Sequence, residues 1–224
     1  MASLLAQVAP SALLAIVAFS AVRNITNRVE FYWLTKNHIV VRSKFDHRLY
    51  RVLDTPHAQN SADILARTRE SMWKVLKMLR TYMSEASRRG EWADGMTPNQ
   101  LDGVRRLTSI FRKVEDLELY ELDWRTNKNI AFNRNKSDGI FLCLLADIDT
   151  QVLASDDVVL FVALHELAHS MQKTYEPLVN GSTVHGAVFK SLESFLIRVA
   201  VSMNLFDPQN IFGKKHCRGI LMES

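Results

Sequence analysis

The chain has 224 residues, of which 47% are hydrophobic and 23% charged, and its formal net charge is +4. This length gives room for one domain with a substantial core plus an appendage, and the composition excludes wholesale disorder. The small positive excess suits contact with an acidic surface without requiring nucleic acid, and two cysteines are too few for a disulfide framework.

The chain begins with an apolar stretch. Residues 2–22 carry no charged side chain and are about as long as the core of a bilayer requires, so we expect a single transmembrane helix. A cleaved signal peptide, with Ala18-Phe19-Ser20 as its cleavage site, is the first alternative, but no basic residue precedes the apolar core. A soluble N-terminal helix is the second alternative.

Basic residues follow this stretch. Arg23, Arg28 and Lys36 lie on its C-terminal side, and the positive-inside rule then places the rest of the chain on the cytoplasmic side. We therefore expect a membrane anchor with its linker over residues 1–36 and the main domain over residues 37–224. On the cytoplasmic side, the glycosylation sequons that begin at Asn24, Asn135 and Asn180 would go unused.

The next segments predict a hairpin and two helices. Residues 37–55 have the pattern of a short hairpin. Residues 60–89 form an amphipathic pattern that predicts a long helix, capped by Ser61 and ended by Gly90. Thr97-Pro98 is a favourable start for a second helix, because threonine can cap it and proline suits its first position.

A second hairpin is expected just before the longest apolar run. Residues 129–132 and 140–144 are short β-prone runs, separated by polar residues that end in Asp138-Gly139. Strands at this place matter, because an extended peptide can bind by adding itself to an exposed sheet edge. We interpret Cys143 as a small core residue and both cysteines as unpaired thiols, which favours a reducing compartment.

The apolar run from Val158 onward ends in an HExxH motif. Such a run predicts a helix buried on nearly all sides, so the ionisable groups at its end need partners. His165 and His169 are four residues apart and project from one face of a helix, where they can share a metal ion. Glu166 is then placed to act on a water bound to the metal. The motif favours a zinc metallopeptidase, with Ser155 as the cap of its helix.

A further histidine, His185, is the candidate third ligand. It precedes a predicted amphipathic helix over residues 187–203, on which Glu193 is the alternative ligand. A catalytic zinc site has three protein ligands and an open position, whereas a structural site usually has four, and neither cysteine lies in a CxxC. Tyr175 and His216 are candidate second electrophiles, although a structural role is favoured for both. We expect irregular structure over residues 206–224.

The motifs resemble those of a known family. HELAHS followed by a loop and HGAVF resembles the pattern of the SprT and WLM zinc peptidases. The wider run resembles the WLM-like metallopeptidases of large nucleocytoplasmic DNA viruses, with a SKFD-like turn, YRV, the IFLCL strand, VALHELAH and HCRGI, from Val41 to the C-terminus. The resemblance implies that His165, His169 and His185 bind Zn²⁺ and that Glu166 is the catalytic acid/base. The spacing of fifteen residues between the second and third histidines is longer than is common in WLM proteins.

These observations predict an α+β fold. We expect a mostly helical, zincin-like metallopeptidase domain with a small β-sheet or hairpin beside the HExxH helix, preceded by one transmembrane helix. The favoured function is a membrane-tethered zinc endopeptidase. The alternative is a structural membrane or virion protein without activity, and a protease acting on DNA–protein crosslinks is a narrower variant of the first. The expected partners are a protein or peptide substrate, a host-cell or virion membrane, virion or capsid proteins and, in the narrower variant, nucleic acid.

Overall fold

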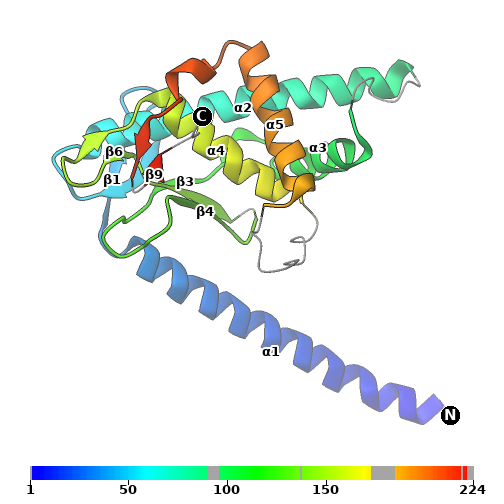
Figure 1. Ribbon diagram of the computed structural model, residues 1–224. Helices are drawn as coiled ribbons and strands as arrows, with labels where there is room; N and C mark the ends of the chain where they lie inside the picture. The colour runs from blue at the N-terminus through cyan, green and yellow to red at the C-terminus, as the bar shows by residue number, and fades with distance from the viewer. Residues whose placement is uncertain (1, 90–95, 137, 173–184, 218, 221–224) are drawn as a thin grey trace. The chain divides into compact units, whose positions relative to one another are not determined.

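A computed structural model describes residues 2–89, 96–136, 138–172, 185–217 and 219–220, and for residues 2–17, 86–89, 215, 219 and 220 it describes the backbone alone. The chain divides into two compact units, Met1–His38 and Ile39–Ser224. Each unit has its own secondary structure, shown in Figure 1.

The first unit consists of one helix, α1, over Ala2–Thr35. In the part of the chain that the structure describes, no helix combines the length and the apolar character of a membrane span. The predicted anchor at residues 2–22 falls mostly on residues 2–17, whose side chains lie outside the described part. The anchor therefore stays a prediction.

The second unit is built on a mixed sheet, which confirms the α+β fold. Its strands occur in the order β1-β2-β3-β5-β4, where β2 and β3 are parallel, β3 and β5 are parallel, and β4 is antiparallel to β5. The strands are β1 (His38–Arg42), β2 (Leu49–Leu53), β3 (Leu119–Glu121), β4 (Ala131–Arg134) and β5 (Gly139–Leu142). Both predicted hairpins are present, and β3 is an additional strand that joins them into one sheet.

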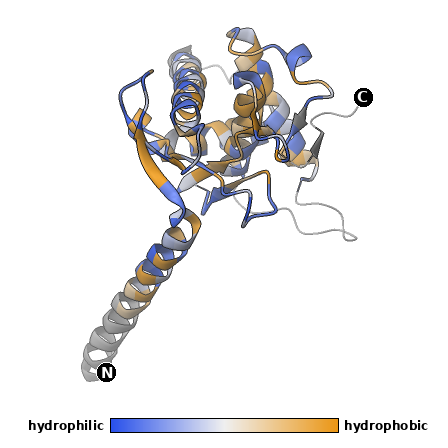
Figure 2. Cartoon of the chain, turned by 90° about the vertical axis from the view of Figure 1, so that its left-hand side faces the viewer, coloured by the Kyte–Doolittle hydropathy of each residue, from blue (hydrophilic) through white to orange (hydrophobic). Residues whose placement is uncertain are grey.

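In its described part this unit has four α-helices, and three of them pack around the fourth, α4 (Asp156–Met171). The other three are α2 (Ala58–Arg89), α3 (Pro98–Ile110) and α5 (Ala187–Ser202), and short 3-10 turns lie at Val114–Asp116 and Pro208–Asn210. Helices α2, α3 and α5 all contact α4, which also contacts β4 and β5. In Figure 2 the apolar residues concentrate inside this unit and the polar residues lie on its outer loops. The position of α4 at the centre makes it the helix with the least access to solvent.

The predicted helix starts agree only in part with the structure. Thr97 caps α3 in a capping box with Gln100, as expected. The prediction for α2 is wrong, because Ser61 lies inside the helix and is fully buried. The helix begins earlier, at Ala58, whose amide donates to the carbonyl of Thr55. Ser155 occupies the cap position of α4 but makes no side-chain capping hydrogen bond, and Gly90 lies outside the described residues.

The C-terminal segment corrects two further expectations. It contains a hairpin, β8 (Lys215–His216) with β9 (Gly219–Ile220), where irregular structure was expected. Cys217 is disulfide-bonded to Cys143, so the two cysteines are not separate thiols. Two-residue strands are too short to leave a periodic pattern, and the bond joins positions 74 residues apart in sequence. Neither feature has a local signal.

Hydrogen bonds reinforce the attachment made by this disulfide. The amide of Cys217 donates to the carbonyl of Leu145 at 2.9 Å, and the Nε2 of the fully buried His216 lies 2.7 Å from the carbonyl oxygen of Cys143. A two-stranded sheet, β6 (Leu145–Asp147) with β7 (Val152–Leu153), lies against β8. The C-terminal hairpin is therefore held to the strand that follows β5.

Reduction of the disulfide should destabilise the second unit. Closing a loop of this length restricts the unfolded chain, and native disulfides typically contribute about 2–4 kcal/mol. We expect the denaturant midpoint of the full chain to fall in dithiothreitol. The Cys143→Ser/Cys217→Ser variant should have the lower midpoint with or without reductant, and equal midpoints for the oxidised wild type and this variant would contradict the expectation.

Candidate metal centre

Helix α4 is buried on most sides, and its two histidines lie on the side that is partly open to solvent. From Val158 to Gln172 every residue is buried except His165 and His169, which are partly exposed. The apolar side chains before the motif are covered by α2, α3, α5 and the sheet. Burial on the other sides thus forces the two imidazoles to face the same opening.

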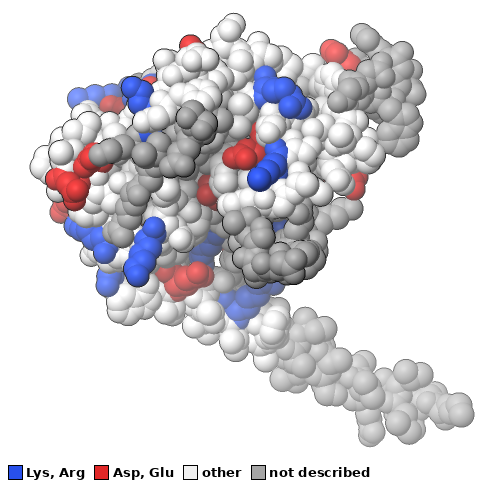
Figure 3. Space-filling model, viewed as in Figure 1, with Lys and Arg blue, Asp and Glu red and all other residues white. Residues whose placement is uncertain are grey.

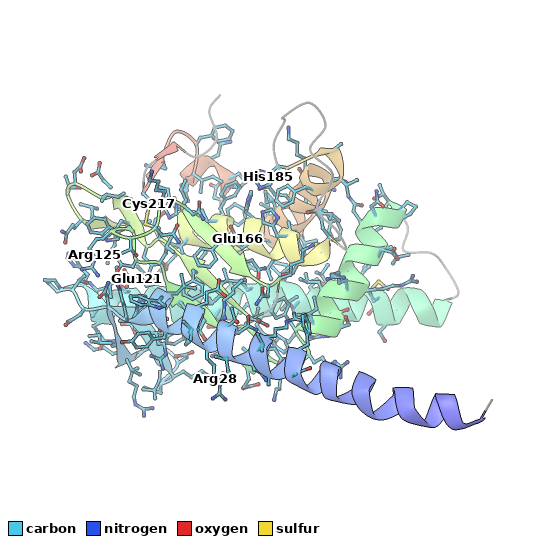
Figure 4. All side chains as sticks on the ribbon, turned by 90° about the horizontal axis from the view of Figure 1, so that it is seen from below. Arg28, Glu121, Arg125, Glu166, His185 and Cys217 are labelled. Carbon is cyan, nitrogen blue, oxygen red and sulfur yellow. A yellow bond between two sulfur atoms is a disulfide. The ribbon has the colours of Figure 1, made fainter. Side chains whose placement is uncertain are left out.

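The start of α5 supplies the third histidine. His185 lies just before this helix, and one ring nitrogen from each of His165, His169 and His185 falls within a group whose members are all within 4.8 Å of one another. Figure 4 shows His185 and Glu166 on neighbouring elements. Among the residues that the structure describes, this is the one such group of histidine, cysteine and acidic side chains.

The spacing of these nitrogens fits a zinc ion. The Nε2 atoms of His169 and His185 are 3.2 Å apart. Two imidazoles that bind zinc tetrahedrally at about 2.0–2.1 Å have their nitrogens roughly 3.3–3.4 Å apart. This pair of nitrogens thus has nearly the separation that zinc requires, and the ligand atom of His165 lies within 4.8 Å of the other two ligand atoms.

Phe189 forms a common support for the three imidazoles. Its ring centre lies 4.9 Å from that of His165, 4.4 Å from that of His169 and 4.5 Å from that of His185. The phenyl ring is almost fully buried and comes from the first turn of α5. It restricts the rotation of the imidazoles and gives the site an apolar wall.

Glu193 lies behind His165 rather than with the group of ligand nitrogens. Its Oε1 is 2.7 Å from His165 Nδ1, so the carboxylate accepts the Nδ1 proton and leaves Nε2 of that ring for a metal. A carboxylate in this position fixes the tautomer and orientation of a histidine ligand. Glu193, the alternative ligand considered from the sequence, therefore contacts a candidate ligand instead of taking a ligand position itself.

The surroundings set the charge of the histidines. Burial, followed by the positive charge of His165 and His185, lowers the pKa of His169 to about 4. Burial also lowers the pKa of His185. For His165, burial lowers the pKa, but the hydrogen bond and charge of Glu193 oppose this effect and the net shift is upward. Neutral imidazoles at His169 and His185 are the form that binds a metal ion.

Glu166 has the environment of a catalytic base. The residue is 5% exposed, and burial raises the pKa of its carboxyl group to about 7, against the opposing effects of the His165 charge and of the Asn133 backbone. A carboxyl group with a pKa near neutrality can both accept and return a proton. The structure thus brings a carboxyl group suited to proton transfer next to the three candidate ligands.

Of the two other residues considered from the sequence, the structure describes only His216, which is not part of this site. Tyr175 lies outside the described residues. His216 is buried against the Cys143 carbonyl, which is the structural role favoured for it. Sequence reasoning did not identify the orienting position of Glu193 or the contact between Asn133 and Glu166, since each depends on two elements distant in sequence.

Comparisons with known proteins gave two matches. No family model matches the chain. It is similar to an uncharacterized protein, R325, of Acanthamoeba polyphaga mimivirus, with 25% identity over 167 residues that cover 74% of this chain and 72% of the relative. Among solved structures it is similar to a mutant of the WLM metalloprotease Wss1 from S. pombe, with 19% identity and a TM-score of 0.35, over 66% of this chain and 91% of the other. The mimivirus relative agrees with the viral resemblance that the motifs show.

Substitutions at the third histidine and at its neighbour should separate ligand from orienting residue. His185→Ala removes a nitrogen from the group and should abolish most zinc affinity. Glu193→Ala leaves all three nitrogens and should weaken zinc binding by about 10–100-fold, the usual cost of losing an orienting partner.

Competition with a chromophoric chelator would measure both affinities. Arg198→Ala, an exposed change on the same helix, is the control and should bind zinc like the wild type. A larger loss of zinc affinity for Glu193→Ala than for His185→Ala would show that Glu193 is the ligand and His185 the orienting residue.

Proposed function

We propose that the chain is a zinc-dependent endopeptidase tethered to a membrane by its N-terminal segment. The observation that carries the proposal is the group of three imidazole nitrogens within 4.8 Å of one another, next to the buried carboxyl group of Glu166. Three neutral protein ligands leave a zinc ion one open position, as in catalytic sites.

The residues of the chain divide the chemistry between them. His165, His169 and His185 would hold zinc, which polarises the scissile carbonyl and makes a water molecule a nucleophile at neutral pH. Glu166 would accept a proton as the water oxygen bonds to the carbonyl carbon, and then deliver it to the amine nitrogen as the carbon–nitrogen bond breaks. The edge strand β4 lies beside α4, where an extended peptide could add to the sheet.

The alternative is a structural membrane or virion protein that keeps this fold without activity. A purely structural role does not require an acidic side chain at position 166, where burial raises the pKa of Glu166 to about 7. Ionising a buried carboxyl group costs free energy, and that cost favours a functional reason for Glu166. The peptidase is therefore the preferred proposal.

A DNA–protein crosslink protease is the narrower variant. Figure 3 shows acidic and basic side chains interspersed over one face of the molecule, with no single basic patch on it. Polyanion binding requires basic residues gathered on one surface. We place protein substrates, including virion or capsid proteins, before DNA-bound ones, because the edge strand β4 beside α4 suits an extended peptide. The similarity to a mimivirus protein favours this viral setting.

The disulfide bears on the proposed location. Disulfides are rare in the cytosol but persist in oxidising surroundings, including virions. We propose that the domain faces the cytoplasm at a host membrane, as Arg23, Arg28 and Lys36 indicate. The bond between Cys143 and Cys217 counts against a permanently reducing location and therefore against this orientation.

Replacing Glu166 tests the peptidase directly. Glu166→Gln keeps the shape of the side chain and removes its basicity, so the variant should fold and bind zinc normally. Proteolysis of casein or of purified virion proteins should fall by roughly 10²- to 10⁴-fold. Glu70→Gln on α2, where the side chain is about half exposed and paired with Lys74, is the matched control and should keep full activity.

Two results would count against the peptidase. A fully zinc-loaded wild type that cleaves neither these proteins, nor itself, nor DNA-bound protein would leave the structural alternative. Equal cleavage by wild type and Glu166→Gln would assign the activity to a contaminant or to another base.

Membrane attachment and orientation need a separate test. The full chain should stay with membranes after alkaline carbonate washing, because an uncharged span of 21 residues, from Ala2 to Val22, would cross the bilayer core. A protein lacking residues 1–36 should be released. Recovery of a mature N-terminus near Ala21 would establish a signal peptide, and a glycan on Asn180 would reverse the proposed orientation.

A further inference from the structure

Strand β4 presents alternate backbone groups outward along the edge of the sheet. The carbonyl of Ile130 accepts a hydrogen bond from the amide of Cys143 on the β5 side. In an antiparallel pair, every second residue directs its backbone groups toward the partner strand. Phe132 and Arg134 therefore face β5, while Ala131 and Asn133 direct their backbone groups away from it.

Asn133 connects this edge to the helix that carries the motif. Its Nδ2 donates to the backbone carbonyl of Glu166 at 2.9 Å and to the hydroxyl of Ser170 at 2.6 Å. The Ser170 hydroxyl in turn donates to the carbonyl of Lys136, just after β4, at 2.6 Å. One amide group thus joins two successive turns of α4 to the strand, and Ser170 ties the end of the strand to the same point.

The backbone of Asn133 reaches the catalytic side chain as well. Its amide points out of the sheet, and the backbone of Asn133 is close enough to the Glu166 carboxyl group to oppose the rise in its pKa that burial causes. The Glu166 carboxyl group is nearly fully buried, so its direction depends on the few polar groups around it. Asn133 therefore holds the backbone of this residue through its side chain, and its own backbone lies near the carboxyl group.

We propose that Asn133 is a positioning residue, which fixes the register of β4 along α4 and so directs the Glu166 carboxyl group toward the sheet edge where a peptide would bind. This inference rests on the peptidase function proposed above. An asparagine suits the position because its amide nitrogen has two hydrogens, one for each acceptor. Aspartate would place a negative oxygen against the carbonyl of Glu166, and alanine would leave that carbonyl and the Ser170 hydroxyl without this partner.

Hydrogen exchange tests the attachment without any need for activity. In the zinc-loaded full chain, Asn133→Ala should speed amide exchange in a peptide covering residues 130–136 by about tenfold, because two buried hydrogen bonds are lost. Exchange in β3 should not change. Asn60→Ala, at an exposed position on α2, is the matched control and should exchange like the wild type. Unchanged exchange in β4 of Asn133→Ala would overturn the proposal, whether or not the protein cleaves peptides.

Kinetics test the effect on Glu166. Asn133→Ala should lower kcat about 10- to 100-fold with zinc affinity changed less than about twofold. In the Glu166→Gln background the same change should lower kcat less than about twofold further, because a positioning residue acts through the group that it positions. The proposal would be overturned if kcat were unchanged in Asn133→Ala, or if the double variant lost kcat by the product of the two single losses. Either result would show that Asn133 serves stability alone.

Ser170→Ala provides a second, milder variant in case Asn133→Ala does not fold. It removes one acceptor of the Asn133 amide and keeps the other, so both the exchange of β4 and kcat should change in the same directions by about threefold. No change in either quantity would count against the proposal. Absence of cleavage by zinc-loaded wild type would refute the peptidase function, while the exchange rates would still decide whether Asn133 holds the strand.

Discussion

The burial of α4 is the constraint on which the rest of the structure depends. A helix that is apolar all round can be stable only when neighbours cover it on nearly every side, and here α2, α3, α5 and the sheet provide that cover. His165 and His169 are what remains partly open between Val158 and Gln172. The hydrophobic core therefore decides where the candidate metal ligands face, and a change in core packing would alter the geometry of the candidate metal centre.

Such a helix must also have its polar groups satisfied from outside. Glu193 of α5 orients one imidazole, and Asn133 of β4 contacts the next residue. At the C-terminal end, Arg106 of α3 and Lys136 donate to carbonyls of Ser170 and Gln172 at 3.0 and 2.9 Å. Cations at this end also complement the helix dipole. Thus α3, α5 and β4 contribute polar contacts as well as apolar cover, and these contacts lie on the half of α4 that carries the motif.

Sequence patterns predicted the parts of this arrangement that depend on local periodicity or on a motif. The helices, the two hairpins, the cap at Thr97 and the residues of the histidine cluster follow from spacing within one segment. Strand β3 was missed because three residues, Leu119–Glu121, give no clear alternation, and the sheet forms only when β3 pairs with β2 and β5. The place of Glu193 was missed for a related reason, since a carboxylate near a histidine can be a ligand or an orienting partner. Only the distance to Nδ1 distinguishes the two.

The disulfide between Cys143 and Cys217 closes the chain between them into a covalent ring. All three histidines, Glu166 and Glu193 lie between these two cysteines in sequence, so the ring contains every proposed ligand and the proposed base. A single break in the backbone between residues 144 and 216 would leave two fragments in one molecule, still joined through sulfur. A nicked chain would therefore keep its ligand set together, and the damage would become visible by size only after reduction.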